Sequence, residues 1–94
     1  MTSDLAAAHL LIKGRVQGVG YRFFAQDTAV NRHLTGWVRN LSGGNVECEV
    51  EGARLAIEGW LEELRQGPPL ARVTEIQISW KPPQRQFNEF SIQG

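Results

Sequence analysis

An α+β sandwich, with two helices on one face of a mostly antiparallel sheet, is the fold class that this sequence predicts. The prediction rests on short apolar or alternating segments typical of strands, on two segments with helical periodicity, and on an order that places each helix between strands. With 94 residues, the chain is large enough for one domain with a core and too short for two.

The first part of the chain predicts a strand followed by a helix. Residues 9–13 (HLLIK) form a short apolar segment typical of a buried strand, and the glycine-rich stretch 14–20 follows it. From residue 21 to about residue 33 the period becomes helical. One face of this predicted helix holds Tyr21, Phe24 or Ala25, Thr28 and Ala29.

A β-hairpin is predicted next. Residues 36–40 (GWVRN) form a short strand, residues 41–44 (LSGG) have the composition of a turn, and residues 45–51 alternate regularly. The side chains expected to face the core are Val46, Cys48 and Val50. Cys48 on this face is expected to act as a small apolar side chain rather than as a nucleophile.

The last part of the chain predicts a second helix and two further strands. Residues 53–66 form the helix, which ends at Gly67-Pro-Pro69, and its apolar positions are Ile57, Trp60, Leu61 and Leu64. Residues 74–80 alternate as a strand, and a short terminal strand holds Phe90 and Ile92. The complete order is that of the split βαβ arrangement found in ferredoxin-like sandwiches.

Within this organisation, residues 1–8 are expected to be a flexible N-terminal tail and residues 9–94 to be the folded domain. Residues 1–8 lack the basic and apolar regions of a secretion signal, so we expect a cytoplasmic protein. The chain ends at Gly94 without zinc-finger cysteines, which favours a free-standing protein. Nothing in the sequence demands more than a monomer.

Composition argues against several classes of partner. Ten basic residues balance ten acidic ones, so the formal net charge is zero and offers no general attraction to nucleic acid or to a membrane surface. No long apolar segment spans a bilayer. The single cysteine, Cys48, and the absence of a Cys or His cluster predict no metal site.

The segment Gly14-Arg-Val-Gln-Gly-Val-Gly-Tyr-Arg22 is the strongest candidate for a site. Its glycines allow positive φ, and the N-terminus of the following helix adds unpaired N–H donors, a combination that binds anions. Arg22 falls in the first helical turn, where its guanidinium can grip two phosphate oxygens. The segment is not a Walker loop, since no Gly-Lys-Ser/Thr ends it. A glycine-rich connection that binds no ligand is the alternative at this point.

The second candidate is Asn40, at the end of a predicted strand and beside a turn. Its side chain could cap the turn or project into a site. Taken alone, the capping interpretation is favoured, since Asn is a common turn residue.

Together these segments closely resemble the acylphosphatase family. The resemblance is carried by Gly14–Arg22 and by Gly36-Trp-Val-Arg-Asn40, with support from Gly44-Asn-Val-Glu47 and Glu51-Gly52, and it covers nearly all of the chain after His9. It implies a ferredoxin-like fold and hydrolysis of acyl phosphates without metal or cofactor. It also implies that Arg22 binds the phosphoryl group and that Asn40 orients the attacking water. The backbone amides that the resemblance assigns to the phosphoryl group are those of Gln17, Gly18, Val19, Gly20, Tyr21 and Arg22.

One departure from the family concerns the end of the first helix. The family usually has an apolar residue and a glycine where this chain has Arg32 and His33. Since glycine there normally adopts the left-handed conformation, we expect His33 or a neighbour to take positive φ, or the helix to end differently. A catalytic base at His33 is an alternative role, although the resemblance places it away from the anion loop.

Two other functions stay open on the sequence. One is a domain that handles carbamoyl phosphate within a larger maturation protein. The other is a non-catalytic ferredoxin-like module that binds RNA or regulates a partner, which needs aromatic and basic side chains together on the open sheet face. Trp37, Arg39 and Arg85 are the residues available for such a face.

Overall fold

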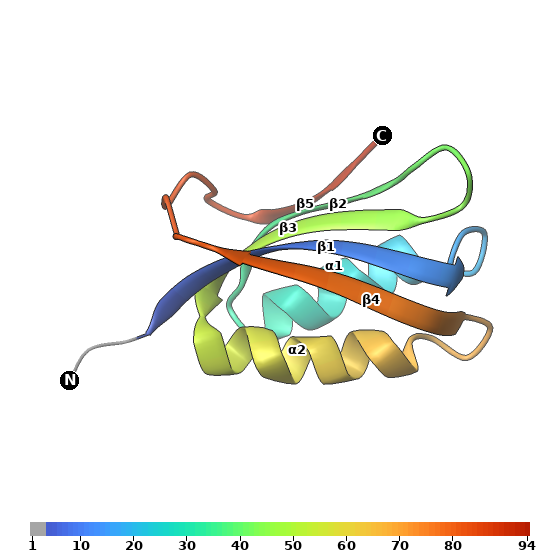
Figure 1. Ribbon diagram of the computed structural model, residues 1–94, viewed down its shortest axis with the longest axis horizontal. Helices are drawn as coiled ribbons and strands as arrows, with labels where there is room; N and C mark the ends of the chain where they lie inside the picture. The colour runs from blue at the N-terminus through green and yellow to red at the C-terminus, as the bar shows by residue number, and fades with distance from the viewer. Residues whose placement is uncertain (1–3) are drawn as a thin grey trace.

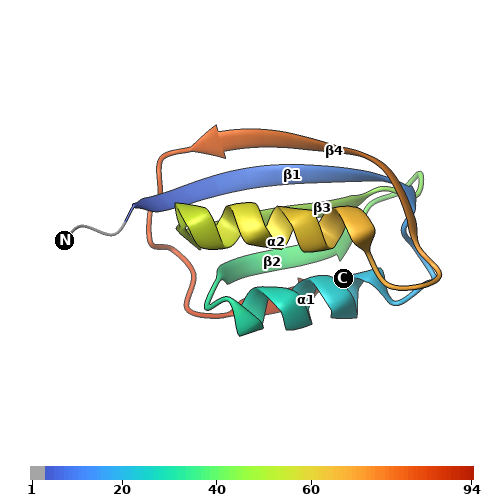
Figure 2. The same cartoon turned by 90° about the horizontal axis from the view of Figure 1, so that it is seen from below.

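The computed structural model describes residues 4–94 as a five-stranded sheet with two helices packed against one face (Figures 1 and 2). The elements in chain order are β1 (Leu5–Arg15), α1 (Tyr21–Asn31), β2 (Thr35–Asn40), β3 (Val46–Ala53), α2 (Arg54–Gln66), β4 (Arg72–Lys81) and β5 (Phe90–Gln93). Within residues 4–94, no helix lies on the other face of the sheet. The predicted α+β fold class is therefore confirmed.

The strand order of the sheet is β4-β1-β3-β2-β5. β1 pairs antiparallel with both β3 and β4, β2 pairs antiparallel with β3, and β5 pairs parallel with β2. The first four strands have the predicted ferredoxin-like topology, in which β3 is inserted between the two strands that α1 connects. β5 extends the sheet at the β2 edge.

The expected start of the domain at residue 9 is wrong. β1 begins at Leu5, and its pairing with β3 runs from Leu5 opposite Ala53 to Ile12 opposite Val46. Residues 5–8 are therefore part of the sheet rather than of a flexible tail. The three alanines at 6–8 lack the large apolar side chains that indicate a strand. They form a strand because β3 is long enough to pair with them, through residues 50–52. Residues 1–3 of the predicted tail lie outside the described residues.

The core between sheet and helices follows the predicted apolar faces. The buried residues of α1 are Tyr21, Ala25, Thr28 and Ala29, and those of α2 are Ile57, Trp60, Leu61 and Leu64. Trp60 links the two helices, since its Nε1 lies 3.0 Å from Thr28 Oγ1 and 3.2 Å from Ala25 O and donates to both. This pairing satisfies a polar group in the centre of the core and fixes α2 against α1.

Two connections that are distant in sequence meet at one end of the sheet. The loop from β1 to α1 lies at the same end as the β2–β3 turn, in both views (Figures 1 and 2). The long connection from β4 to β5 lies at the opposite end (Figure 1). Any site formed by residues around 14–22 and 40 must therefore lie at the first of these ends.

Candidate active site

The loop between β1 and α1 turns through two left-handed glycines. Gly18 has φ of 74° and Gly20 has φ of 78°. An added Cβ at either position would meet no heavy atom within 4 Å, so glycine is required here for the backbone conformation and not for packing. Such turns direct successive N–H groups to one side and form a concave donor surface for an anion.

The N-terminus of α1 adds donors to this loop. Gly20 is the N-cap residue, no side chain caps the helix, and its first turn contains no acidic residue. The first hydrogen bond of the helix runs from Phe24 N to Gly20 O at 3.1 Å. The N–H groups of Tyr21, Arg22 and Phe23 therefore have no intrahelical acceptor and carry the positive end of the helix dipole.

Asn40 is the last residue of β2, and its side chain has an unsatisfied acceptor. Its Oδ1 is buried and accepts no hydrogen bond from any residue in the range 4–94. A buried acceptor without a donor costs about 1–3 kcal/mol, so a ligand or water that donates to it is favoured. Because Oδ1 accepts no turn N–H, the structure does not support the capping interpretation.

Arg22 and Asn40 line the same cavity, of about 90 Å³. Its other lining residues are Val16, Gly18, Gly20, Tyr21 and Phe23. Arg22 is half-buried, and none of the ion pairs found across residues 4–94 involves its guanidinium. The cavity thus brings together a free cation, the start of a helix whose first N–H groups have no intrahelical acceptor, and a buried oxygen without a donor.

Not every predicted site residue contributes a side chain to this cavity. Tyr21 turns its ring into the core, where its hydroxyl donates to Leu64 O at 2.7 Å and where burial raises its pKa. Only the backbone of Tyr21 is therefore available to a ligand. Val19 packs partly against the core, and the Gln17 side chain donates to the β2–β3 turn. The assignment of the Gln17 and Val19 amides to the phosphoryl group stays a prediction.

Val16 and Phe23 line the cavity but were not among the predicted site residues. Phe23 is 68% exposed, although it is large and apolar. A signal for it is present in the sequence, because Phe23 falls outside the apolar face of the helix and directly follows Arg22. No sequence signal distinguishes Val16 from an ordinary core valine.

Two alternative catalytic side chains lie elsewhere. Cys48 is completely buried, and burial is the main cause of its raised pKa, so its thiol has the properties of a core side chain. His33 follows α1 at the end opposite to Arg22, and eleven helical residues at about 1.5 Å each separate the two ends by roughly 16 Å. The structure therefore does not place His33 at the cavity.

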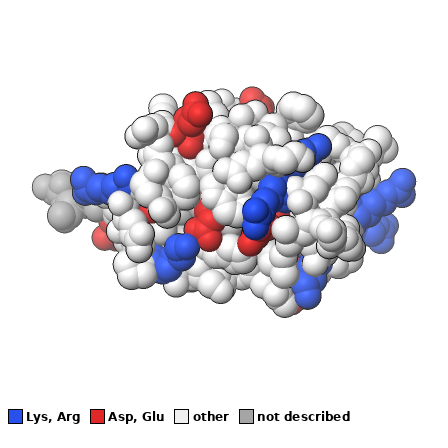
Figure 3. Space-filling model, turned by 90° about the horizontal axis from the view of Figure 1, so that it is seen from above, with Lys and Arg blue, Asp and Glu red and all other residues white. Residues whose placement is uncertain are grey.

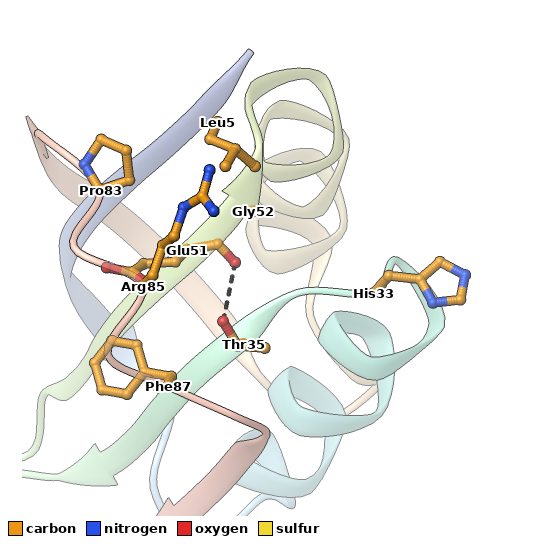
Figure 4. A pocket seen from close by; sticks show the side chains of 8 residues that line it. All are labelled: Leu5, His33, Thr35, Glu51, Gly52, Pro83, Arg85 and Phe87. Atoms are coloured by element: carbon orange, nitrogen blue, oxygen red, sulfur yellow. Dashed lines mark hydrogen bonds between the residues drawn. The ribbon is translucent and has the colours of Figure 1, made fainter. Parts of the chain in front are cut away.

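A larger cavity, of about 250 Å³, lies at that opposite end of the sheet. Its lining includes Glu51, Arg85 and Phe87, and Figure 4 shows the His33 ring directed away from the other labelled side chains. Glu51 is buried and accepts the Gln84 N–H at 2.9 Å. This cavity has no helix N-terminus or glycine-rich loop among its lining residues, which distinguishes it from the cavity at Arg22 and Asn40.

Among residues 4–94, no group of three or more His, Cys, Asp or Glu side chains is placed to hold a metal ion. In the same part of the chain, neither helix has the length and apolar character needed to cross a bilayer.

Comparison with known proteins shows which family this chain is similar to. The model of the Acylphosphatase family matches residues 8–92. An acylphosphatase from Bacillus pumilus is 44% identical over 86 residues, which cover 92% of this chain and 96% of that protein. The crystal structure of acylphosphatase from Bacillus subtilis superposes with a TM-score of 0.92 at 36% identity, covering 95% of this chain and 99% of the other.

A further similarity is to one part of a much larger protein. Full-length HypF, crystallised in a phosphate- and nucleotide-bound form, matches all of this chain at 34% identity with a TM-score of 0.90. The match covers only 12% of the HypF chain. The family model and the relatives of similar length agree on one assignment, and the chain belongs to the acylphosphatase family.

Proposed function

We propose that the cavity at Arg22 and Asn40 is the place where this chain hydrolyses acyl phosphates to a carboxylate and inorganic phosphate. Acyl phosphate hydrolysis follows from membership of the family; the roles of individual residues are our proposal. The observation that supports these roles is the buried, unpaired Asn40 Oδ1, which lines the same cavity as Arg22 and the start of α1.

The chemistry needs few protein groups. An acyl phosphate releases a carboxylate, whose conjugate acid has a pKa of about 4, so the leaving group needs no general acid. Phosphoryl transfer then depends mainly on positioning and on neutralising charge on the equatorial oxygens. In our proposal the Arg22 guanidinium and the amides of residues 17–22 supply this positive charge.

Asn40 supplies the positioning of water. Its Oδ1 can accept one hydrogen bond from a water molecule, which turns a lone pair of the water oxygen toward phosphorus. The proton lost by the water passes to a phosphate oxygen of the substrate in this mechanism. A bell-shaped rate profile that follows an enzyme group would contradict that route.

We further propose a free-standing, monomeric, cytoplasmic enzyme that acts on a small molecule and not on RNA. The match covers 96% of the Bacillus pumilus acylphosphatase, so that relative consists of little more than this domain, which supports the proposal of a free-standing enzyme. Figure 3 views the sheet face away from the helices and shows acidic and basic side chains next to one another. On this face Arg39 pairs with Glu47 and Lys81 pairs with Glu49, both at 2.7 Å, so these cations are already neutralised.

Parallel kinetics of Asn40→Ala and Arg22→Gln test the proposed roles. Asn40→Ala should lower kcat by about 100-fold or more, by analogy with the loss of one transition-state donor, while inorganic phosphate inhibits almost as in the parent. Arg22→Gln should lower both kcat and phosphate affinity, because the guanidinium binds the same group before and during reaction. Benzoyl phosphate is a suitable substrate, and circular dichroism checks that each variant is folded.

The alternatives make different predictions in the same experiment. If Asn40 only stabilises the hairpin, Asn40→Ala should lose about 1 kcal/mol of unfolding free energy and keep its turnover. An equal loss of phosphate affinity in both variants would instead assign Asn40 to the anion cradle. If the parent protein binds RNA and hydrolyses neither benzoyl nor carbamoyl phosphate, the proposal that it hydrolyses acyl phosphates at this cavity is refuted.

A further inference from the structure

The Gln17 side chain connects the two segments that form the cavity. Its Nε2 lies 2.8 Å from Leu41 O and 2.8 Å from Asn45 O. One amide nitrogen carries two hydrogens, so Gln17 can donate to both carbonyls at once. The side chain is half-buried and belongs to the loop that leads into α1.

The two carbonyls belong to the turn that directly follows Asn40. Leu41 N–H donates to Asn45 O at 2.9 Å, and Gly44 N–H donates to Leu41 O at 3.3 Å. Gln17 therefore binds the turn at both of its ends. Any movement of the turn relative to the loop would stretch at least one of these bonds.

The sheet holds Asn40, which pairs with Val46 of β3, but it does not hold the loop at 16–20 and the turn at 41–45 together. The pairing of β1 with β3 ends at Ile12 opposite Val46, before the loop and the turn begin. Beyond that point, within residues 4–94, the two Gln17 bonds are the hydrogen bonds that join residues 16–20 to residues 41–45. Hydrogen bonding between the anion loop and the turn that directly follows Asn40 thus depends on one side chain.

We propose that the Gln17 side chain is a positioning residue, which holds Asn40, and through it the attacking water, in register with the phosphate loop. The inference rests on the proposed function of Asn40. Displacement of a reacting group by about 1 Å costs on the order of 100-fold in rate. Loss of the Gln17 bonds should therefore lower kcat and leave phosphate binding nearly unchanged, since Arg22 and the helix N–H groups are not attached to the turn.

A double-mutant cycle tests this coupling. Gln17→Met keeps the approximate length of the side chain and removes both donors, and we expect kcat to fall by at least about 10-fold with phosphate inhibition changed by less than about 3-fold. In the Asn40→Ala background the same substitution should cost less than about 2-fold, because the residue through which it acts is gone. In the Arg22→Gln background its full effect should return.

Gln17→Glu tests the role of the two donors through the pH dependence of kcat, which a merely structural contact would not change. An ionised carboxylate has no donor for the two carbonyls, so kcat at neutral pH should fall further than in Gln17→Met. As the pH falls and the carboxyl binds a proton, one donor returns, and kcat should rise relative to the parent at the same pH. Gln26→Met is the matched control, since Gln26 Nε2 donates to Phe90 O at 3.0 Å, away from the cavity, and its kcat should match that of the parent.

Three results would overturn the proposal. The first is an unchanged kcat in Gln17→Met, and the second is a double variant in which the effects of Gln17→Met and Asn40→Ala on kcat multiply in full. The third is a fall in the phosphate affinity of Gln17→Met as large as the fall in its kcat. If the Asn40→Ala variant keeps its turnover, the proposed role of Asn40 itself is refuted. The same cycle contains this variant, so the two failures can be told apart. NMR relaxation of the Asn40 side-chain amide tests positioning without any activity. Its order parameter should fall in Gln17→Met and not in Gln26→Met, and an unchanged value would also count against the proposal.

Discussion

His33 is one of two non-glycine residues, with Arg85, that have positive φ within residues 4–94. Its φ is 59°, and it follows the C-terminus of α1. Leu34 N–H donates to Ala29 O at 2.9 Å and His33 N–H donates to Val30 O at 3.0 Å, which together form a Schellman motif. The expected positive φ at the end of this helix is confirmed. The motif explains why the helix can still end here without glycine, because its two hydrogen bonds satisfy carbonyl groups of the last turn.

Replacing His33 with Gly should raise the free energy of unfolding by about 1 kcal/mol. Glycine removes the cost of the left-handed conformation, although part of the gain is lost to the greater entropy of the unfolded chain. His33→Ala is the control, because it removes the imidazole and retains the strain, so it should give no gain. Urea denaturation measures all three proteins, and equal stabilisation by Gly and Ala would show that the imidazole and not the backbone is unfavourable.

At the scale of elements, the close approach of β2 and β3 depends on Gly36. This residue has φ of 141°, and a Cβ there would lie 1.9 Å from Glu49 O. The obstructing atom is backbone in the neighbouring strand, which cannot move without breaking the ladder. Gly52 has a similar φ of 156°, but its Cβ would meet the end of the Leu34 side chain at 2.5 Å.

These two glycines form a matched pair for substitution. Gly36→Ala should destabilise the protein by more than about 3 kcal/mol, since strain at positive φ adds to a backbone clash. Gly52→Ala should cost only about 1–2 kcal/mol, because the Leu34 side chain can turn away. Thermal or urea unfolding gives both values. Equal losses of unfolding free energy would mean that the backbone of the strand, and not neighbouring side chains, shifts to accommodate the added methyl group.

For the whole molecule, the cavity couples phosphate binding to stability, since a ligand that binds only the folded state shifts the unfolding equilibrium. Inorganic phosphate at 100 times its Kd should stabilise the protein by about 2.7 kcal/mol. For a domain of 60–100 residues this raises Tm by on the order of 10 °C or more. Differential scanning fluorimetry across a phosphate titration measures the shift.

The Arg22→Gln variant locates this stabilisation. If phosphate binds at the cavity, the variant should lose most of the Tm shift, because it lacks the Arg22 guanidinium, which is the free cation there. A shift of the same size in parent and variant would place the bound phosphate elsewhere, with the cavity near Arg85 as the next site to examine.

Local patterns were sufficient for most of the fold. The alternation at 45–51 and the apolar stripe at Ile57, Trp60, Leu61 and Leu64 correctly predicted β3 and the buried face of α2, because burial of one face imposes these periods on a sequence. The start of β1 was missed because Ala6, Ala7 and Ala8 carry no strand signal of their own. Their partners on β3 decide their conformation.

By itself, the sequence determined the fold class and the helix faces, since these depend on periodicity within one segment. It also identified Arg22 and Asn40 as candidate site residues, but only through the resemblance to a known family that two segments carry together. Only the tertiary structure decided that Asn40 Oδ1 is buried without a donor, that it shares a cavity with Arg22, and that Gln17 joins the two segments. Those facts depend on side chains from separate segments meeting at one end of the sheet. Hydrogen bonds between separate segments leave no period or spacing in a single sequence.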